Sequence, residues 1–215
     1  MKKQLFLLLS FLLITAIVLS GCGGGSPSVQ VKTIEYQDDG NGFTQFYTND
    51  KRNYNYSFWH SDLTPEETTF PVEIQVKKLS GNKSMVHGAF FCYKDDHNFY
   101  RVVIDTEGNY YIFKHNSNGT EPRTTIRGKT ASPNLNTGYN TLNTIHVERD
   151  DEGQFTIKFN NNYKNDTEVI TFEDTTFTGG RCGFYVAVGD ETQEQFPNTP
   201  VDVRFKQILP EGASI

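Results

Sequence analysis

From about residue 29 onward, the chain alternates apolar and polar positions over short stretches, and turn residues separate these stretches. In residues 70–77, Val72, Ile74 and Val76 fall on one face and polar residues fall between them. This period of two is typical of a half-buried β-strand. Residues 89–93 form a more continuously apolar stretch, which we also interpret as a strand.

The same pattern predicts strands along the rest of the chain. They are expected at 99–104, 110–114, 140–149, 155–159, 169–172, 182–188 and 201–208. In the stretch 140–149, Leu142, Ile145 and Val147 are predicted to point inward. No window of twelve residues has helical periodicity, and short, regularly spaced strands with turns between them indicate an all-β sandwich or barrel.

Two tight turns join three of these strands into a predicted meander. Residues 95–98 (DDHN) separate the strand at 89–93 from the strand at 99–104, and residues 106–109 (TEGN) precede the strand at 110–114. Asp, Asn and Gly favour such turns because their backbone or side chain satisfies the turn geometry.

The first residues differ from all that follows. Lys2 and Lys3 form a short basic start, and residues 5–19 are an apolar run that only Ser10 and Thr15 interrupt. A basic start, an apolar run of about 7–15 residues and small residues at its end indicate an export signal. A transmembrane helix is the alternative, but it needs about 20 apolar residues. We therefore expect residues 1–21 to be a signal peptide.

The end of this run, residues 19–22 (LSGC), resembles the lipobox of bacterial lipoproteins. The resemblance implies cleavage before Cys22 and lipidation of its thiol, so that acyl chains anchor the mature protein to a membrane. Residues 22–28 then form the lipidated cysteine and a flexible tether. We expect a cell-envelope protein outside the cytoplasm, and Gly23 at the position after the cysteine favours the outer membrane if the cell has one.

The net charge of the mature chain limits which kinds of molecule it can bind. Removing residues 1–21 takes away two lysines and no acidic residue, which leaves 18 basic and 26 acidic residues and a net charge of −8. A negative chain is poorly suited to nucleic acid, so we predict no nucleic-acid partner. The remaining 194 residues suit one β domain.

The other two cysteines, Cys92 and Cys182, both fall in predicted strands. In an export compartment they form either a disulfide or a pair of buried, free thiols, and the sequence leaves both states open. The five histidines show no metal-ligand spacing relative to these cysteines, so we predict no metal site and no cofactor.

The order of several segments resembles concanavalin A-like jelly-roll domains, a superfamily with laminin-G-like and keto-disaccharide-hydrolase-like members. The segments are 88–91 (GAFF), 95–101 (DDHNFYR), 108–111 (GNYY), 140–143 (NTLN), 155–161 (FTIKFNN), 177–184 (FTGGRCGF) and 201–206 (VDVRFK). The resemblance implies an antiparallel, two-sheet jelly-roll β-sandwich over residues 68–209. Residues 29–67 supply either its first strands or an aromatic-rich flap, and residues 210–215 form a tail.

The resemblance does not extend to the catalytic pattern. Glycosidases of this superfamily carry two carboxylates on one strand, in an E-x-D-x-(x)-E arrangement that flanks the sugar. Here Glu73 is followed by Gln75 and then by Lys77, so we predict no catalytic residues. A glycoside-cleaving enzyme of the keto-disaccharide-hydrolase-like group stays an alternative.

Aromatic residues give the leading functional hypothesis, a non-catalytic recognition domain for carbohydrate. Their flat faces stack on sugar rings, and Asn and Asp provide planar hydrogen-bonding groups. The candidate ligand-binding residues are Trp59, His60, Tyr54, Tyr56, Tyr110 and Tyr111. Because Tyr110 and Tyr111 are adjacent in a strand, one of them is expected to face away from the core. The aromatics alternatively fill the β core, and the protein alternatively contacts an envelope protein through a sheet edge or a surface patch.

Overall fold

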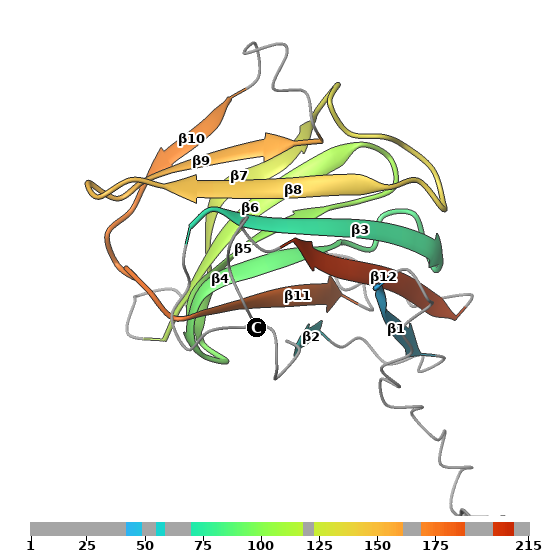
Figure 1. The fold of residues 1–215 in the computed structure, drawn as a ribbon, viewed down its shortest axis with the longest axis horizontal. Helices are drawn as coiled ribbons and strands as arrows, with labels where there is room; N and C mark the ends of the chain where they lie inside the picture. Colours follow the sequence, from blue (N-terminus) through green and yellow to red (C-terminus); the bar gives the residue numbers. More distant parts are fainter. Residues whose placement is uncertain are drawn as a thin grey trace, which may run out of the picture.

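The computed structural model describes residues 42–48, 55–58, 70–117, 123–160, 169–187 and 200–208, and only the backbone of residues 55–58. These residues form two layers of antiparallel strands (Figure 1). The predicted all-β, two-sheet antiparallel sandwich is therefore confirmed. Within the described residues, no helix is long and apolar enough to span a membrane.

The first sheet has six strands. Their order is β1 (Thr44–Thr48), β12 (Val201–Ile208), β3 (Val72–Ser80), β8 (Asn143–Arg149), β9 (Gln154–Phe159) and β10 (Ile170–Glu173). Strand β3 has the predicted alternation, because Val72, Ile74 and Val76 are buried while the residues between them are partly exposed. One face of this sheet therefore meets the core and the other face meets solvent.

The second sheet also has six strands. Their order is β2 (Asn55–Phe58), β11 (Arg181–Ala187), β4 (His87–Asp95), β5 (Asn98–Ile104), β6 (Asn109–Asn116) and β7 (Arg123–Ala131). Strands β4 to β6 are the predicted meander, and β7 extends it. Unlike β3, strands β4, β5 and β11 are buried at almost every position, so both faces of this sheet carry covered side chains.

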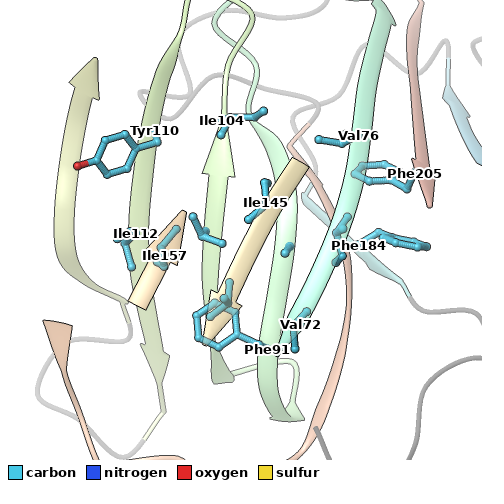
Figure 2. Packing of buried hydrophobic residues seen from close by; sticks show 14 of the residues in the cluster. Val72, Val76, Phe91, Ile104, Tyr110, Ile112, Ile145, Ile157, Phe184 and Phe205 are labelled. Atoms are coloured by element: carbon cyan, nitrogen blue, oxygen red, sulfur yellow. The ribbon is translucent and has the colours of Figure 1, made fainter. Parts of the chain in front are cut away.

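The core lies between the two sheets and is rich in aromatic rings. Phe91 and Tyr100 of the second sheet stack with ring centroids 5.6 Å apart, and Phe155 of the first sheet lies 5.1 Å from Tyr100. At the other side of the core, Phe184 stacks on Phe205 across the two sheets at 4.9 Å. Figure 2 shows Phe91, Phe184 and Phe205 with neighbouring aliphatic side chains between the layers.

Hydrogen bonds at one edge also join the two sheets. Asp174, just after β10, accepts a hydrogen bond from the Tyr100 hydroxyl at 2.7 Å and one from Lys114 Nζ at 2.6 Å. Burial opposes ionisation of Asp174, but the hydrogen bonds from Lys114, Thr176 and Tyr100 outweigh burial and lower its pKa to about 2. The charged carboxylate therefore fixes the segment after β10 against β5 and β6.

Two details differ from the sequence-based prediction. Leu142 was predicted to point inward, but it precedes β8 and its side chain is 42% exposed, whereas Ile145 and Val147 are buried as expected. The strand β7 was not predicted. It is an edge strand in which only Ile126 and Thr130 are even partly buried, so it carries no apolar alternation that would reveal it.

Candidate functional site: an aromatic sheet face with a basic corner

The two adjacent tyrosines of β6 point to opposite faces of the second sheet. Tyr110 belongs to the core, where its ring lies 5.3 Å from that of Phe159 (Figure 2). Tyr111 lies on the other face, stacked on Phe113 with the ring centroids 6.1 Å apart. The expectation that one of the pair faces away from the core is thus confirmed, while both side chains are at most 9% exposed.

The structure does not describe the side chains of the other four candidate ligand-binding residues. Trp59, His60 and Tyr54 lie outside the described residues. Tyr56 lies in β2, where the backbone pairs with Val186 of β11, and its side chain is outside the described part of the structure. Their role in ligand binding stays a prediction.

Cys92 and Cys182 are both buried and both free thiols, so the disulfide alternative is not the state seen. The Sγ atom of Cys182 accepts a hydrogen bond from Gln207 Nε2 at 3.4 Å. Burial raises the pKa of Cys92 to about 12 and that of Cys182 to about 11. Both thiols therefore stay protonated near neutral pH, and the protonated form is a poor nucleophile for disulfide exchange.

The face of the second sheet that points away from the core carries a separate cluster of rings. We call it the aromatic face, and it consists of Phe90, Tyr93, Phe99, Tyr111, Phe113 and Tyr185. Alternation along the strands explains the cluster, because Tyr100, Val102 and Ile104 of β5 enter the core while Phe99 and Val103 take the other side. Strand register then places Tyr111 beside Val103.

Arg101 occupies the centre of the aromatic face. Its guanidinium carbon lies 4.4 Å from the ring centroid of Phe113 and 4.4 Å from that of Tyr185, and the residue is only 1% exposed. The guanidinium of Arg101 therefore makes cation–π contacts with two rings. Because buried arginines are rare in folded proteins, this placement marks a specialised position rather than a solvated charge.

One row of side chains crosses the end of this face. Strand register sets Phe99 of β5 beside His115 of β6, and His115 beside Arg123 of β7. The ring of His115 stacks on Phe99 with centroids 4.3 Å apart and planes within 5° of parallel. Tyr93 lies 5.8 Å from Phe99 on its other side. We call Tyr93, Phe99 and His115 the ring platform, and both of its outer members are partly exposed.

Polar groups border the ring platform at the turn between β4 and β5. The Tyr93 hydroxyl donates to Asp96 Oδ1 at 2.6 Å, and Asn98 Nδ2 donates to Asp95 at 2.8 Å. Asn98 Oδ1 accepts a hydrogen bond from the backbone N–H of Ser117 at 3.1 Å, which links this turn to the end of β6. The β4–β5 turn therefore places planar amide and carboxylate groups beside the ring platform.

The outer face of the first sheet has a different character. His146 Nδ1 lies 3.2 Å from Glu73 Oε2, and its Nε2 lies 2.9 Å from Glu148 Oε1. Lys158 Nζ lies 3.3 Å from Glu148 Oε2. Because the imidazole occupies the space between the two carboxylates, Glu73 and Glu148 do not flank an open site for a glycosidic bond. The described His, Cys, Asp and Glu residues form no group of three or more that could hold a metal ion.

The comparisons with known proteins concern the fold. No protein-family model matches the chain, and no curated protein matches it. The carbohydrate-binding module CBM66 from Bacillus subtilis superposes with a TM-score of 0.51 and 17% identity, covering 77% of this chain and 92% of that one. This chain shares its fold with a carbohydrate-binding module. A functionally unknown protein from Saccharomyces cerevisiae gives a TM-score of 0.50 and 15% identity, covering 86% and 95% of the two chains.

Sequence reasoning missed most of the residues in this site. Arg101, His115 and Arg123 were not singled out, because Arg101 is one cation in an otherwise buried strand and the other two lie among polar neighbours at strand ends. The available signal was Arg101 inside the run FYRVVI, where one cation interrupts a buried strand. The proximity of His115 and Arg123 depends on strand register, which the sequence pattern does not define.

Proposed function

We propose that this protein is a membrane-anchored extracytoplasmic lipoprotein whose β-sandwich recognises carbohydrate without cleaving it, through the ring platform of the second sheet. The observation that carries the proposal is the row of three neighbouring rings, Tyr93, Phe99 and His115, beside the amide and carboxylate groups of the β4–β5 turn; His115 stacks on Phe99, and Tyr93 is tilted against Phe99 by 41°. Aromatic faces stack on sugar rings, and planar polar groups bind their hydroxyls.

Two further observations support this function. The chain shares its fold with a protein whose name is carbohydrate-binding module, and that likeness covers 92% of the module. Within the described residues, the outer face of the first sheet has polar side chains joined by ion pairs, whereas the second sheet carries the aromatic side chains on its outer face. Recognition surfaces are enriched in aromatic residues relative to the remaining surface.

The glycan proposal is tested by a glycan array with the full-length protein purified in detergent. The native protein is compared with Tyr93→Ala, which shortens the ring platform, and with Tyr47→Ala, which makes the same chemical change in β1 of the first sheet. We expect the native protein and Tyr47→Ala to bind the same glycans and Tyr93→Ala to lose them, because stacking requires the ring.

Two results would contradict the proposal. Equal glycan binding by Tyr93→Ala and the native protein would remove the ring platform from recognition. An absence of binding to every glycan would reject carbohydrate recognition and redirect the search to envelope proteins. Trp59→Ala belongs on the same array, because Trp59 is among the candidate ligand-binding residues predicted from the sequence.

The anchoring part of the proposal rests on the LSGC motif and has its own test. Cells that express the chain are fed a radiolabelled fatty acid, and the membrane fraction is examined for the labelled protein. We expect the native chain to incorporate the label and Cys22→Ser to incorporate none, since the thiol carries the lipid. Labelling of Cys22→Ser would show that the anchor, if any, lies elsewhere.

A further inference from the structure

Positive charge converges on the end of the aromatic face where β5, β6 and β7 lie side by side. The guanidinium carbon of Arg123 is 5.0 Å from the ring centroid of Phe113, and that of Arg101 is 4.4 Å from the same ring. Register sets Arg123 directly beside His115, which stacks on Phe99. We call Arg101, Arg123, His115 and His97 the basic corner.

The pKa of His115 shows that the other members of the basic corner lie close enough to affect its ionisation. Burial, and after it the charges of Arg101, Arg123 and His97 in that order, together lower the pKa of His115 to about 3. Every charged group that shifts this pKa is a base, and none is a carboxylate. The imidazole is therefore neutral at pH 7, and its buried Nε2 has no hydrogen-bond partner among the described residues.

Two carboxylates of the neighbouring β4–β5 turn, those of Asp95 and Asp96, accept hydrogen bonds from groups in and next to that turn. Asp95 Oδ1 accepts hydrogen bonds from the backbone N–H of His97 and from Asn98, both at 2.8 Å. Asp96 Oδ1 accepts the hydroxyl of Tyr93 at 2.6 Å. These contacts order the turn next to the basic corner, and neither carboxylate is among the groups that shift the pKa of His115.

The basic corner contrasts with the charge of the chain as a whole. The full sequence has 20 Lys and Arg residues against 26 Asp and Glu residues. A chain with this balance repels anions at long range, so the proximity of Arg101 and Arg123 is not a consequence of general basicity. Aromatic platforms beside arginine suit a ligand that has both an apolar ring face and an anionic group.

We propose that the glycan recognised by this protein is acidic, with one sugar ring packed on the ring platform and its carboxylate bound by Arg123. This inference rests on the proposed function and specifies its ligand class. Arg123 is exposed and lies at the end of the Phe99–His115 row, so its side chain borders the platform without being enclosed by it. The guanidinium fork matches a carboxylate in a bidentate arrangement, which gives geometric selectivity over neutral sugars.

The test places carboxylated and neutral oligosaccharides on one array and probes it with the full-length protein in detergent. The carboxylated members are oligogalacturonate, oligomannuronate and sialyllactose, and the neutral members include cello-, xylo- and fructo-oligosaccharides. The variants are Arg123→Gln and Arg204→Gln. The second makes the same change in β12 of the first sheet, and thermal melting verifies that both variants are folded.

The expected result is binding confined to carboxylated members, weakened by about tenfold or more in Arg123→Gln because a charge-assisted hydrogen bond is lost. Arg204→Gln should bind as the native protein does. Titration with the methyl ester of the bound sugar should show a similar loss, since esterification removes the charge and keeps the ring.

The outcomes separate this inference from the proposed function. Binding of neutral oligosaccharides that Arg123→Gln leaves unchanged would overturn the acidic-ligand inference and leave carbohydrate recognition in place. Equal binding of a carboxylated sugar and its methyl ester would also overturn it. Binding of no oligosaccharide of either kind would overturn both.

Discussion

The outer faces of the two sheets are built from the same kind of strand and have opposite chemistry. On the first sheet, β3 alternates buried and partly exposed residues, and its outward positions include Glu73, which contacts His146. On the second sheet, every residue of β5 after Asn98 is buried, and the outward positions are Phe99, Arg101 and Val103. One face is thus solvated by polar side chains, while the other is an aromatic layer around a cation.

This difference shows where the sequence departs from what folding alone requires. A sandwich needs one apolar face on each sheet, because only the inner faces meet. The first sheet has only this one apolar face, as the alternation in β3 shows. The second sheet has a further apolar face, with Arg101 held between two rings and Arg123 bordering the same ring. The packing of the two sheets against each other does not require this additional aromatic layer.

The largest expected effect comes from removing the ring at the centre of the aromatic face. Phe113→Ala should lower the free energy of unfolding by about 3–5 kcal/mol, because a buried ring leaves a cavity and two guanidinium groups lose their contact. Tyr47→Ala, on the partly exposed outer face of β1, should cost less than about 1.5 kcal/mol. Urea unfolding followed by circular dichroism measures both.

A loss below about 1 kcal/mol for Phe113→Ala would mean that the aromatic face is not a packed layer. The two outer faces would then be energetically alike, and the contrast between the sheets would be one of composition only. A loss for Tyr47→Ala as large as that for Phe113→Ala would lead to the same conclusion.

The smallest effect is expected on the polar face. Glu148→Gln should lower the free energy of unfolding by less than about 1 kcal/mol at neutral pH and low salt, because the carboxylate is 44% exposed. The hydrogen bond from His146 lowers the pKa of Glu148, burial opposes this, and Lys158 lowers it further. The contribution is therefore present above the ordinary pKa of a glutamate and lost as pH falls through the lowered value.

Unfolding measured across a pH series detects this loss. The difference between native protein and Glu148→Gln should disappear in acid once Glu148 is protonated, and it should shrink when salt is added. A difference that persists well below the ordinary pKa of a glutamate would contradict the ion-pair account of this face.

The contrast between the faces also explains how much the sequence could predict. The strand at 72–76 was predicted because it is buried on one face only, so its pattern has a period of two. The polar edge strand β7 gave no such pattern and was missed, and Leu142 was misplaced because an apolar residue in the loop before β8 extended the apparent strand. The all-β class followed from the regular spacing of strands and turns, and the two-sheet arrangement was implied by the resemblance to concanavalin A-like domains.

The candidate site was far less predictable. The adjacent pair Tyr110 and Tyr111 indicated one outward ring, since neighbouring residues in a strand point to opposite faces. The ring platform and the basic corner combine residues of β4, β5, β6 and β7, and their proximity is a product of register. Periodicity within one strand contains no information on the partner residues of the next.

The most direct test of the central claim is a crystal structure of the protein with the glycan that binds most tightly in the array. The account predicts electron density for a sugar ring on Tyr93 and His115, with an acidic group within hydrogen-bonding distance of Arg123. A glycan bound instead over the outer face of the first sheet, near His146, would contradict the assignment of the recognition surface to the second sheet.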